Sequence, residues 1–362
     1  MTAITTPLSP GIQPATPLHS HPPPPPHPPS DPRVSAIDNF THTTHSTPNS
    51  TLRASLSFPR TSFTVAILGA SRGIGAGIAL SYARAGATTL ILAARNTTQL
   101  GTVAARVREV NPHCAVCVRA CDVASPTSVR ALARFVGDEA LGGDDSTEGE
   151  GGTKAGGGTT GEGKKKKALD VLVLNAGYSG HVELEVTDGD AAAEDGGEWA
   201  QAFAVNALGT YHAAHYFVPL LLRGGGGAQG GGAFCVVGSI AGCIRRGIIA
   251  NSKYCISKMA QVRIVEHVAE QFGGKGLLAV AVHPGAVETT MAMETAPEEF
   301  KKYLVDDPEL CGHFLVWLTR EPGRFQWLNG RLVSANWDPD ELLAKKDEII
   351  AGDLLKFEAK TA

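Results

Sequence analysis

Residues 63–86 carry the sequence FTVAILGASRGIGAGIALSYARAG, which is an apolar run, a glycine-rich turn and an apolar helical stripe in succession. The run Phe63 to Leu68 has the length of a buried strand, and the glycines that follow it end the strand. Residues 73–86 then predict a helix, because their apolar side chains recur at a spacing that favours one face. The stretch therefore predicts a strand that feeds directly into a helix.

The same alternation continues toward the C-terminus. Further strands are expected at 88–94, 113–120, 169–174, 233–237, 277–282 and 331–333. Helices are expected at 97–110, from Ser125 onward, at 198–222, around Tyr254 as far as Phe272, and at 341–350. Strands that alternate with helices predict a parallel sheet covered on both faces, in a single doubly wound α/β domain of the Rossmann type. Ligands of such sheets bind beyond the carboxyl ends of the strands.

Two low-complexity segments lie outside this pattern. Residues 1–60 hold most of the chain's 22 prolines and predict a disordered tail, with a polyproline II run at 22–29. Residues 142–167 are a glycine-rich insert that ends in four lysines. The ordered domain is therefore expected at 61–362, interrupted by this insert. The tail also resembles ligands of SH3 or WW domains, which leaves an interaction protein as an alternative.

Composition argues against several classes of protein. A net charge of −4 with 19% charged residues does not suggest nucleic acid as a partner. No apolar run reaches the roughly 18 residues that a membrane span needs. Seven cysteines, an odd number, and the lack of a signal-peptide pattern favour reduced thiols and a cytoplasmic protein. The cysteines at 114, 117 and 121 are interpreted as strand residues and not as metal ligands, because no second Cys/His pair lies at a finger-like distance.

The glycine turn predicts a site for a dinucleotide. Its sequence is Gly69-Ala70-Ser71-Arg72-Gly73-Ile74-Gly75, with the spacing G-x-x-x-G-x-G. Glycines let the backbone approach a pyrophosphate, and the helix N-terminus offers free N–H groups to it. The expected cofactor-binding residues of the turn are Gly69, Ser71, Arg72, Gly73, Ile74 and Gly75.

The ends of the next three strands extend this site. Arg95 follows the second strand, where an arginine can hold the 2′-phosphate of the cofactor, and Arg72 could reach the same group. These arginines predict NADP(H) in preference to NAD(H). Asp122 and Val123 follow the third strand and are expected at the adenine. The tripeptide Asn175-Ala176-Gly177 follows the fourth strand, where small residues leave room for the cofactor.

Tyr254 and Lys258 form a candidate proton-transfer pair. Four residues apart on a helix, they share one face. A phenol titrates near pH ~10, and a neighbouring ammonium is expected to lower that pKa. Ser239 follows the fifth strand and can donate to a substrate carbonyl oxygen. Asn206 lies inside the long helix at 198–222, where it could hold a water or the lysine.

Together these motifs resemble the short-chain dehydrogenase/reductase family over about residues 63–338, in the family's order. The closing stretch at 336–338 and its helix are similar to those of a fungal subgroup. The resemblance implies a catalytic tetrad of Asn206, Ser239, Tyr254 and Lys258, with Tyr254 and Lys258 also at the cofactor. Residues 284–289 match the family's P-G-x-x-x-T element, which implies that Val287 and Thr289 contact the nicotinamide carboxamide.

The sequence departs from the family pattern in three ways, one of which is the extra length of the N-terminal tail and of the two glycine tracts. Leu68 replaces a threonine before the first glycine, which removes a loop-bracing hydrogen bond. Ser239 lies fifteen residues before Tyr254, two more than is usual, and the extra length falls at about 245–250.

The resemblance implies an NADP(H)-dependent oxidoreductase that interconverts a carbonyl and a secondary alcohol of a small molecule, with Tyr254 as acid and base. A non-catalytic NADP(H) sensor of the same fold is the alternative. Oligomerisation through the helices that carry Asn206 and Tyr254 is common in the family. The substrate pocket is expected from 178–182, 243–249 and 291–303, with Arg245 or Arg246 available to pair with a substrate carboxylate.

Overall fold

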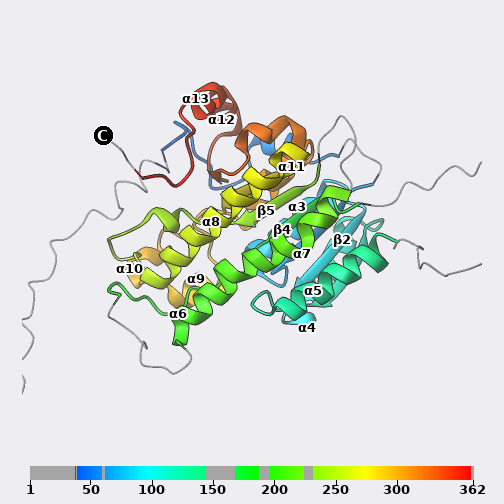
Figure 1. The fold of residues 1–362 in the computed structure, drawn as a ribbon, viewed down its shortest axis with the longest axis horizontal. Coiled ribbons are helices and arrows are strands. Elements are labelled where there is room, and N and C mark those ends of the chain that lie inside the picture. Colours follow the sequence, from blue (N-terminus) through cyan, green and yellow to red (C-terminus); the bar gives the residue numbers. More distant parts are fainter. Residues whose placement is uncertain are drawn as a thin grey trace, which may run out of the picture.

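A parallel sheet of seven strands forms the centre of the molecule (Figure 1). The computed structural model describes residues 37, 39–58, 62–142, 168–186, 196–223 and 231–359. The strand order is β3-β2-β1-β4-β5-β6-β7, so the direction of winding reverses between β1 and β4. The strands are Thr64–Leu68 (β1), Thr89–Ala94 (β2), Ala115–Ala120 (β3), Val171–Leu174 (β4), Ala233–Val237 (β5), Leu278–His283 (β6) and Leu332–Ser334 (β7). The predicted doubly wound fold is confirmed.

Helices cover both faces of the sheet. On one face lie Gly73–Arg84 (α3), Thr97–Val110 (α4) and Leu310–Thr319 (α11). On the other lie Pro126–Phe135 (α5), Gly209–Arg223 (α7) and Ser252–Phe272 (α8). Shorter helices are Ser50–Ala54 (α2), Gly197–Ala202 (α6), Thr290–Thr295 (α9), Glu298–Lys301 (α10), Pro339–Ala344 (α12) and Lys346–Ala351 (α13). The π-helical segments are Val136–Ala140 (η1) and Phe203–Leu208 (η2). The 3-10 helical segments are Ile240–Cys243 (η3), Gly273–Lys275 (η4) and Pro322–Leu328 (η5).

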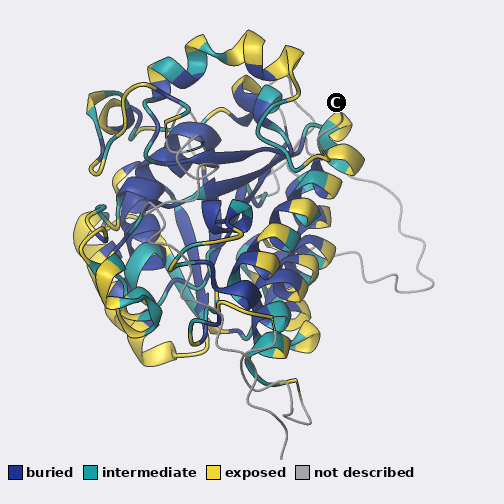
Figure 2. Ribbon diagram, turned by 90° about the vertical axis from the view of Figure 1, so that its left-hand side faces the viewer, coloured by how far each residue is buried: buried dark blue, intermediate teal, exposed yellow. Residues whose placement is uncertain are grey.

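The central strands are buried on both faces, which explains why they read as continuous apolar runs. Every residue of β1, β4 and β5 is buried, and Figure 2 shows the dark sheet between helices whose outer faces are exposed. One core lies between the sheet and α3, α4 and α11, and a second lies between the sheet and α5, α7 and α8. Alternating faces of each strand contribute to the two cores.

The predicted elements are found within a few residues of their expected bounds, with two differences in detail. The closing helix expected at 341–350 is divided into α12 and α13. The helix expected at 198–222 consists of α6, the π-helical segment η2 and α7. Asn206 lies inside η2 and is fully buried. Single π turns within α-helices are rare and occur frequently at functional sites.

The N-terminal region requires a correction. Residues 39–58, expected within a disordered tail at 1–60, form α2 and an antiparallel bridge between Thr44 and Trp337. Leu52 is fully buried in the core beside α3 and α11, and Figure 1 shows this blue segment beside the red α12 and α13. Its few apolar residues meet apolar surface of the C-terminal region, which offsets the entropy of ordering them. The polyproline run at 22–29 and residues 143–167 of the insert lie outside the described residues.

All seven cysteines are free thiols. Within the described part of the chain, no helix combines the length and the apolar character that a membrane crossing requires.

Candidate active site

Two cavities meet at the carboxyl edge of the sheet, where the predicted residues of six strand ends come together. The larger cavity has a volume of about 690 Å³ and lies over the glycine turn, and the smaller, of about 550 Å³, lies beside Ser239. Tyr254 lines both cavities, as do Gly238 and Thr289. A molecule in one cavity can therefore touch a molecule in the other at the tyrosine.

The larger cavity gathers most of the predicted cofactor residues. Its lining includes Gly69, Ser71, Arg72, Gly73, Ile74, Arg95, Asp122, Val123, Asn175, Ala176, Gly177, Tyr254, Lys258 and Thr289. Two predicted residues, Gly75 and Val287, are not in this lining. Val287 is buried, is bridged to Asp306 and lines the smaller cavity.

Gly75 serves to pack the glycine turn. A Cβ atom on Gly75 would lie 2.0 Å from the carbonyl oxygen of Gly69, so no larger residue fits. Gly69 has φ +93°, and a Cβ atom there would lie 2.5 Å from the amide nitrogen of Ala176. The Asn175 Nδ2 atom donates to the Gly69 carbonyl oxygen at 2.8 Å and so braces the ends of β1 and β4.

The N-terminus of α3 suits a phosphate group. The cap residue Arg72 makes no side-chain hydrogen bond to the first turn, which leaves that turn's N–H groups for a ligand. Arg72 and Arg95 are exposed at the cavity, and neither pairs with an acid among the described residues. The uncapped helix and the glycine turn fit the phosphates of a dinucleotide.

Ser239 holds the hydroxyl of Tyr254. Ser239 caps η3, where its Oγ atom accepts from the Ala241 amide at 3.0 Å, and its side chain also hydrogen-bonds Tyr254. The two extra residues before Tyr254 therefore leave the serine in contact with the tyrosine. Burial raises the pKa of Tyr254 to about 12, and the Ser239 hydrogen bond opposes this rise only in part.

The prediction that the Tyr254 pKa falls below its ordinary value is wrong, because burial raises it. The Lys258 Nζ atom donates to the Val237 carbonyl oxygen at 3.0 Å and to the Gln261 Oε1 atom at 2.8 Å. It lies 5.8 Å from the centre of the Tyr254 ring. Burial also lowers the pKa of Lys258 to about 7. Desolvation therefore decides the direction of both pKa shifts, because it disfavours the charged form of each side chain.

Asn206 reaches Lys258 through a residue that sequence reasoning missed. The Asn206 amide group bonds both backbone groups of Tyr178, at 2.9 and 2.8 Å, and donates to Ser257 at 2.9 Å. Its backbone carbonyl oxygen accepts from the Gln261 Nε2 atom at 3.1 Å. Gln261 thus joins Asn206 to Lys258. The sequence spacing could have indicated Gln261, since it lies three residues after Lys258 on the same helix face.

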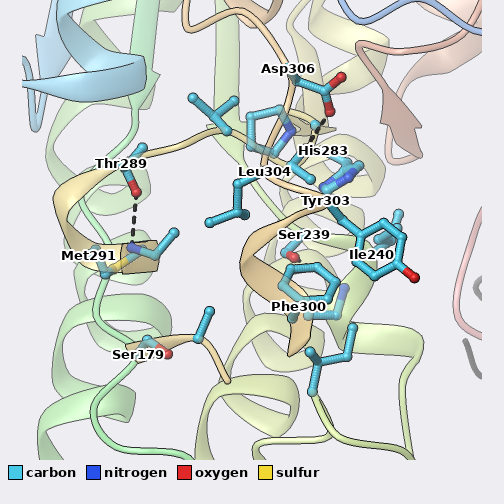
Figure 3. Close-up of a pocket in the computed structure, with 18 of the residues that line it drawn as sticks. Ser179, Ser239, Ile240, His283, Thr289, Met291, Phe300, Tyr303, Leu304 and Asp306 are labelled. Carbon is cyan, nitrogen blue, oxygen red and sulfur yellow. Dashed lines mark hydrogen bonds between the residues drawn. The ribbon is translucent and has the colours of Figure 1, made fainter. Parts of the chain in front are cut away.

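The smaller cavity has mostly apolar walls. The predicted segments contribute Ser179, Val182, Ile244, Ile249, Met291 and Phe300, among others. Figure 3 shows Phe300, Tyr303 and Leu304 around the space that Ser239 and Ile240 also face. Arg245 and Arg246, proposed to pair with a substrate carboxylate, are exposed and line neither cavity. Residues 39 and 44–46, which were not expected at the site, do line the smaller cavity.

The fold and site define a nucleotide-binding α/β protein in which a hydrogen-bonded serine and tyrosine lie between a dinucleotide cavity and a second, apolar cavity. The model of the family described as short chain dehydrogenase matches residues 63–143 and 161–299. The chain therefore belongs to the short-chain dehydrogenase family. As a member it is an oxidoreductase whose fold binds a nicotinamide dinucleotide.

Similar proteins include several from fungi. The chain is 33% identical over 330 residues to short chain dehydrogenase pgmD of Aspergillus terreus, which covers 88% of this chain and 93% of that protein. It is 36% identical over 295 residues to short chain dehydrogenase citE of Monascus ruber, covering 81% and 87%. A solved 7α-hydroxysteroid dehydrogenase, in complex with NADH and 7-oxo glycochenodeoxycholic acid, superposes with a TM-score of 0.59 at 20% identity and covers 80% of this chain and 96% of that chain. At that identity the superposition shows the fold alone.

Proposed function

We propose that the protein interconverts a carbonyl and a secondary alcohol with NADP(H), and that Tyr254 is the acid and base. The observation that carries this proposal is the position of Tyr254, which lines both cavities and hydrogen-bonds Ser239. A carbonyl group in the smaller cavity can therefore meet a proton donor and a cofactor at one place.

In the reductive direction, Ser239 and Tyr254 hydrogen-bond the carbonyl oxygen, and Tyr254 transfers its proton to it. The raised pKa of about 12 keeps the phenol protonated at neutral pH, which is the state that can donate. The phenolate that remains is stabilised by the Ser239 hydroxyl and by the positive charge of Lys258. Gln261 and the Val237 carbonyl oxygen hold the Lys258 amine in place.

The preference for NADP(H) is supported by the two arginines at the cavity. The glycine turn and the N-terminus of α3 would hold the pyrophosphate, and Arg72 and Arg95 would pair with the 2′-phosphate. Asp122 and Val123 would contact the adenine, and Lys258 and Thr289 would contact the nicotinamide ribose and carboxamide, since all four line the larger cavity. When bound, the cofactor supplies or accepts the hydride at the carbonyl carbon.

The proposal is tested with purified protein, NADPH or NADH, and a panel of cyclic ketones, followed through absorbance of the reduced cofactor. Tyr254→Phe is expected to lower kcat by about 10²–10⁴-fold, because it removes the transferred proton. Binding of NADPH, measured by fluorescence titration, is expected to stay within about twofold of wild type. Turnover retained by Tyr254→Phe would show that another group supplies the proton.

A further inference from the structure

The smaller cavity has a polar wall that comes from the chain before the first strand. Four residues of the N-terminal segment line it: Asn39, Thr44, His45 and Ser46. We propose that this segment, residues 39–46, is part of the substrate site and limits the size of the ketone that reaches Ser239 and Tyr254. This inference rests on the proposed function of the same site.

Hydrogen bonds to Asn336 and Asp307 hold the segment in place. The His45 amide donates to the Asn336 carbonyl oxygen at 2.7 Å, and the Asn336 Nδ2 atom donates to the His45 carbonyl oxygen at 3.0 Å. The Asp307 amide donates to the Ser46 carbonyl oxygen at 2.8 Å. The neighbouring Asp306 and Asn336 themselves line the cavity. The segment is therefore a preformed wall.

A contact with the Asp338 carboxylate positions His45. Its Nε2 atom lies 2.9 Å from the Asp338 Oδ2 atom, and the Asn49 Nδ2 atom donates to the same oxygen at 3.2 Å. Burial by itself would raise the pKa of Asp338, but hydrogen bonds from His45 and from two amides of α12 lower it below its usual range. Asp338 thus stays ionised and keeps the ring of His45 beside the cavity.

The rest of the lining indicates the class of substrate. Phe300 and Tyr303, whose ring centres lie 5.9 Å apart, join three isoleucines of the 240–249 region in an apolar lining. A volume of about 550 Å³ lies within the range of roughly 300–1,000 Å³ that is typical of sites for small molecules. The site therefore fits an apolar cyclic ketone that carries a hydrogen-bonding group distant from its carbonyl, where the polar wall can meet it.

Changes in the wall can be separated from changes in cofactor binding, because no described residue before Leu68 lines the dinucleotide cavity. Thr44→Trp fills the cavity from the wall. His42→Trp is the matched control, since His42 is exposed in the same segment and lines neither cavity. Unchanged NADPH binding and an unchanged melting temperature establish that both variants fold.

The first measurement compares kcat/KM for cyclohexanone and benzophenone with NADPH. Thr44→Trp is expected to lower the value for benzophenone about tenfold or more relative to cyclohexanone, and His42→Trp is expected to keep the wild-type ratio. An unchanged ratio in Thr44→Trp overturns the inference.

A second measurement needs no turnover. Irradiated benzophenone inserts into nearby C–H bonds, and peptide mass spectrometry locates the adducts. Adducts within residues 39–46 of the wild type that disappear in Thr44→Trp support the inference, and adducts confined to other segments overturn it. Wild-type protein that is labelled at 39–46 but oxidises NADPH with no ketone of the panel would contradict the proposed function while leaving this site in place.

Discussion

Burial controls the two titrating residues of the site. Tyr254 is held in its neutral, proton-donating form by a pKa of about 12, and Lys258 is brought to a pKa of about 7. The lysine therefore changes charge within the physiological range. Its charge depends on the groups that accept its hydrogen bonds, of which Gln261 is the one side chain among the described residues.

Two substitutions of Gln261, by leucine and by glutamate, are expected to move the alkaline fall of kcat/KM in opposite directions. The ammonium form of Lys258, which stabilises the phenolate, is lost as pH rises through its pKa. Gln261→Leu removes an acceptor and lowers that pKa, so the alkaline fall in rate moves to lower pH by roughly one unit. Gln261→Glu places a negative charge beside the amine and moves the fall to higher pH. If the pH profiles of the wild type and both variants superimpose, Lys258 does not cause the alkaline fall in rate.

Arg72 and Arg95 are expected to set the choice of cofactor. Arg95→Ala and Arg72→Ala should each weaken NADPH binding about tenfold or more, because a charge-assisted hydrogen bond to phosphate is lost. Binding of NADH should change little. Arg119→Ala is the control, since this exposed arginine lies over the Phe135 ring and outside the cavity. Equal losses for both cofactors would contradict a role at the 2′-phosphate.

At the scale of elements, a buried ion-pair network joins the segment after β4 to α6 and to the start of α8. Lys253 is fully buried between Glu183, at 2.6 Å, and Glu198, at 2.8 Å. Tyr178 donates to Glu198 at 3.0 Å. Because Lys253 precedes Tyr254, this network fixes the first turn of the helix that carries the tyrosine. Partnered charges of this kind are costly to break.

Glu198→Gln is expected to destabilise the protein in a pH-dependent way. Burial by itself raises the pKa of Glu198, yet hydrogen bonds from Lys253, His181 and Tyr178 lower it from 4.5 to about 2. A lowered pKa gives stability above pH 4.5 that is lost as pH falls toward 2. The variant should lose about 1–3 kcal/mol in urea unfolding at pH 7, with a smaller loss at pH 3. Glu348→Gln, in an exposed pair, is the control. A loss that is equal at both pH values would argue against the carboxylate's charge as the cause.

At the scale of the whole molecule, residues 39–58 belong to the same core as the sheet. Phe58 stacks on Phe63 with ring centres 3.8 Å apart, and α2 packs on α11 and α12. The segment therefore joins the start of the sheet to the C-terminal helices. Its folding is expected to be cooperative with that of the domain.

Leu52→Ala tests this cooperativity. Leu52 is fully buried, so its truncation is expected to lower the free energy of unfolding by about 2–5 kcal/mol. The exposed Ser50→Ala is the control. Chemical unfolding followed by tryptophan fluorescence and by circular dichroism should shift together. A variant as stable as the wild type would mean that α2 unfolds separately from the sheet.

Patterns within short stretches of sequence were sufficient to predict the parallel sheet, the glycine turn at 69–75, and the residues that follow six of the strands. Periodicity and turn chemistry act over a few residues, and parallel strands bring their carboxyl ends to one edge whatever lies between them. The direction of the Tyr254 pKa shift, the position of Gln261 between Asn206 and Lys258, and the wall at 39–46 were decided by tertiary structure. Each depends on desolvation or on contacts between residues far apart in the chain. Short sequence patterns specify neither the burial of a side chain nor such contacts.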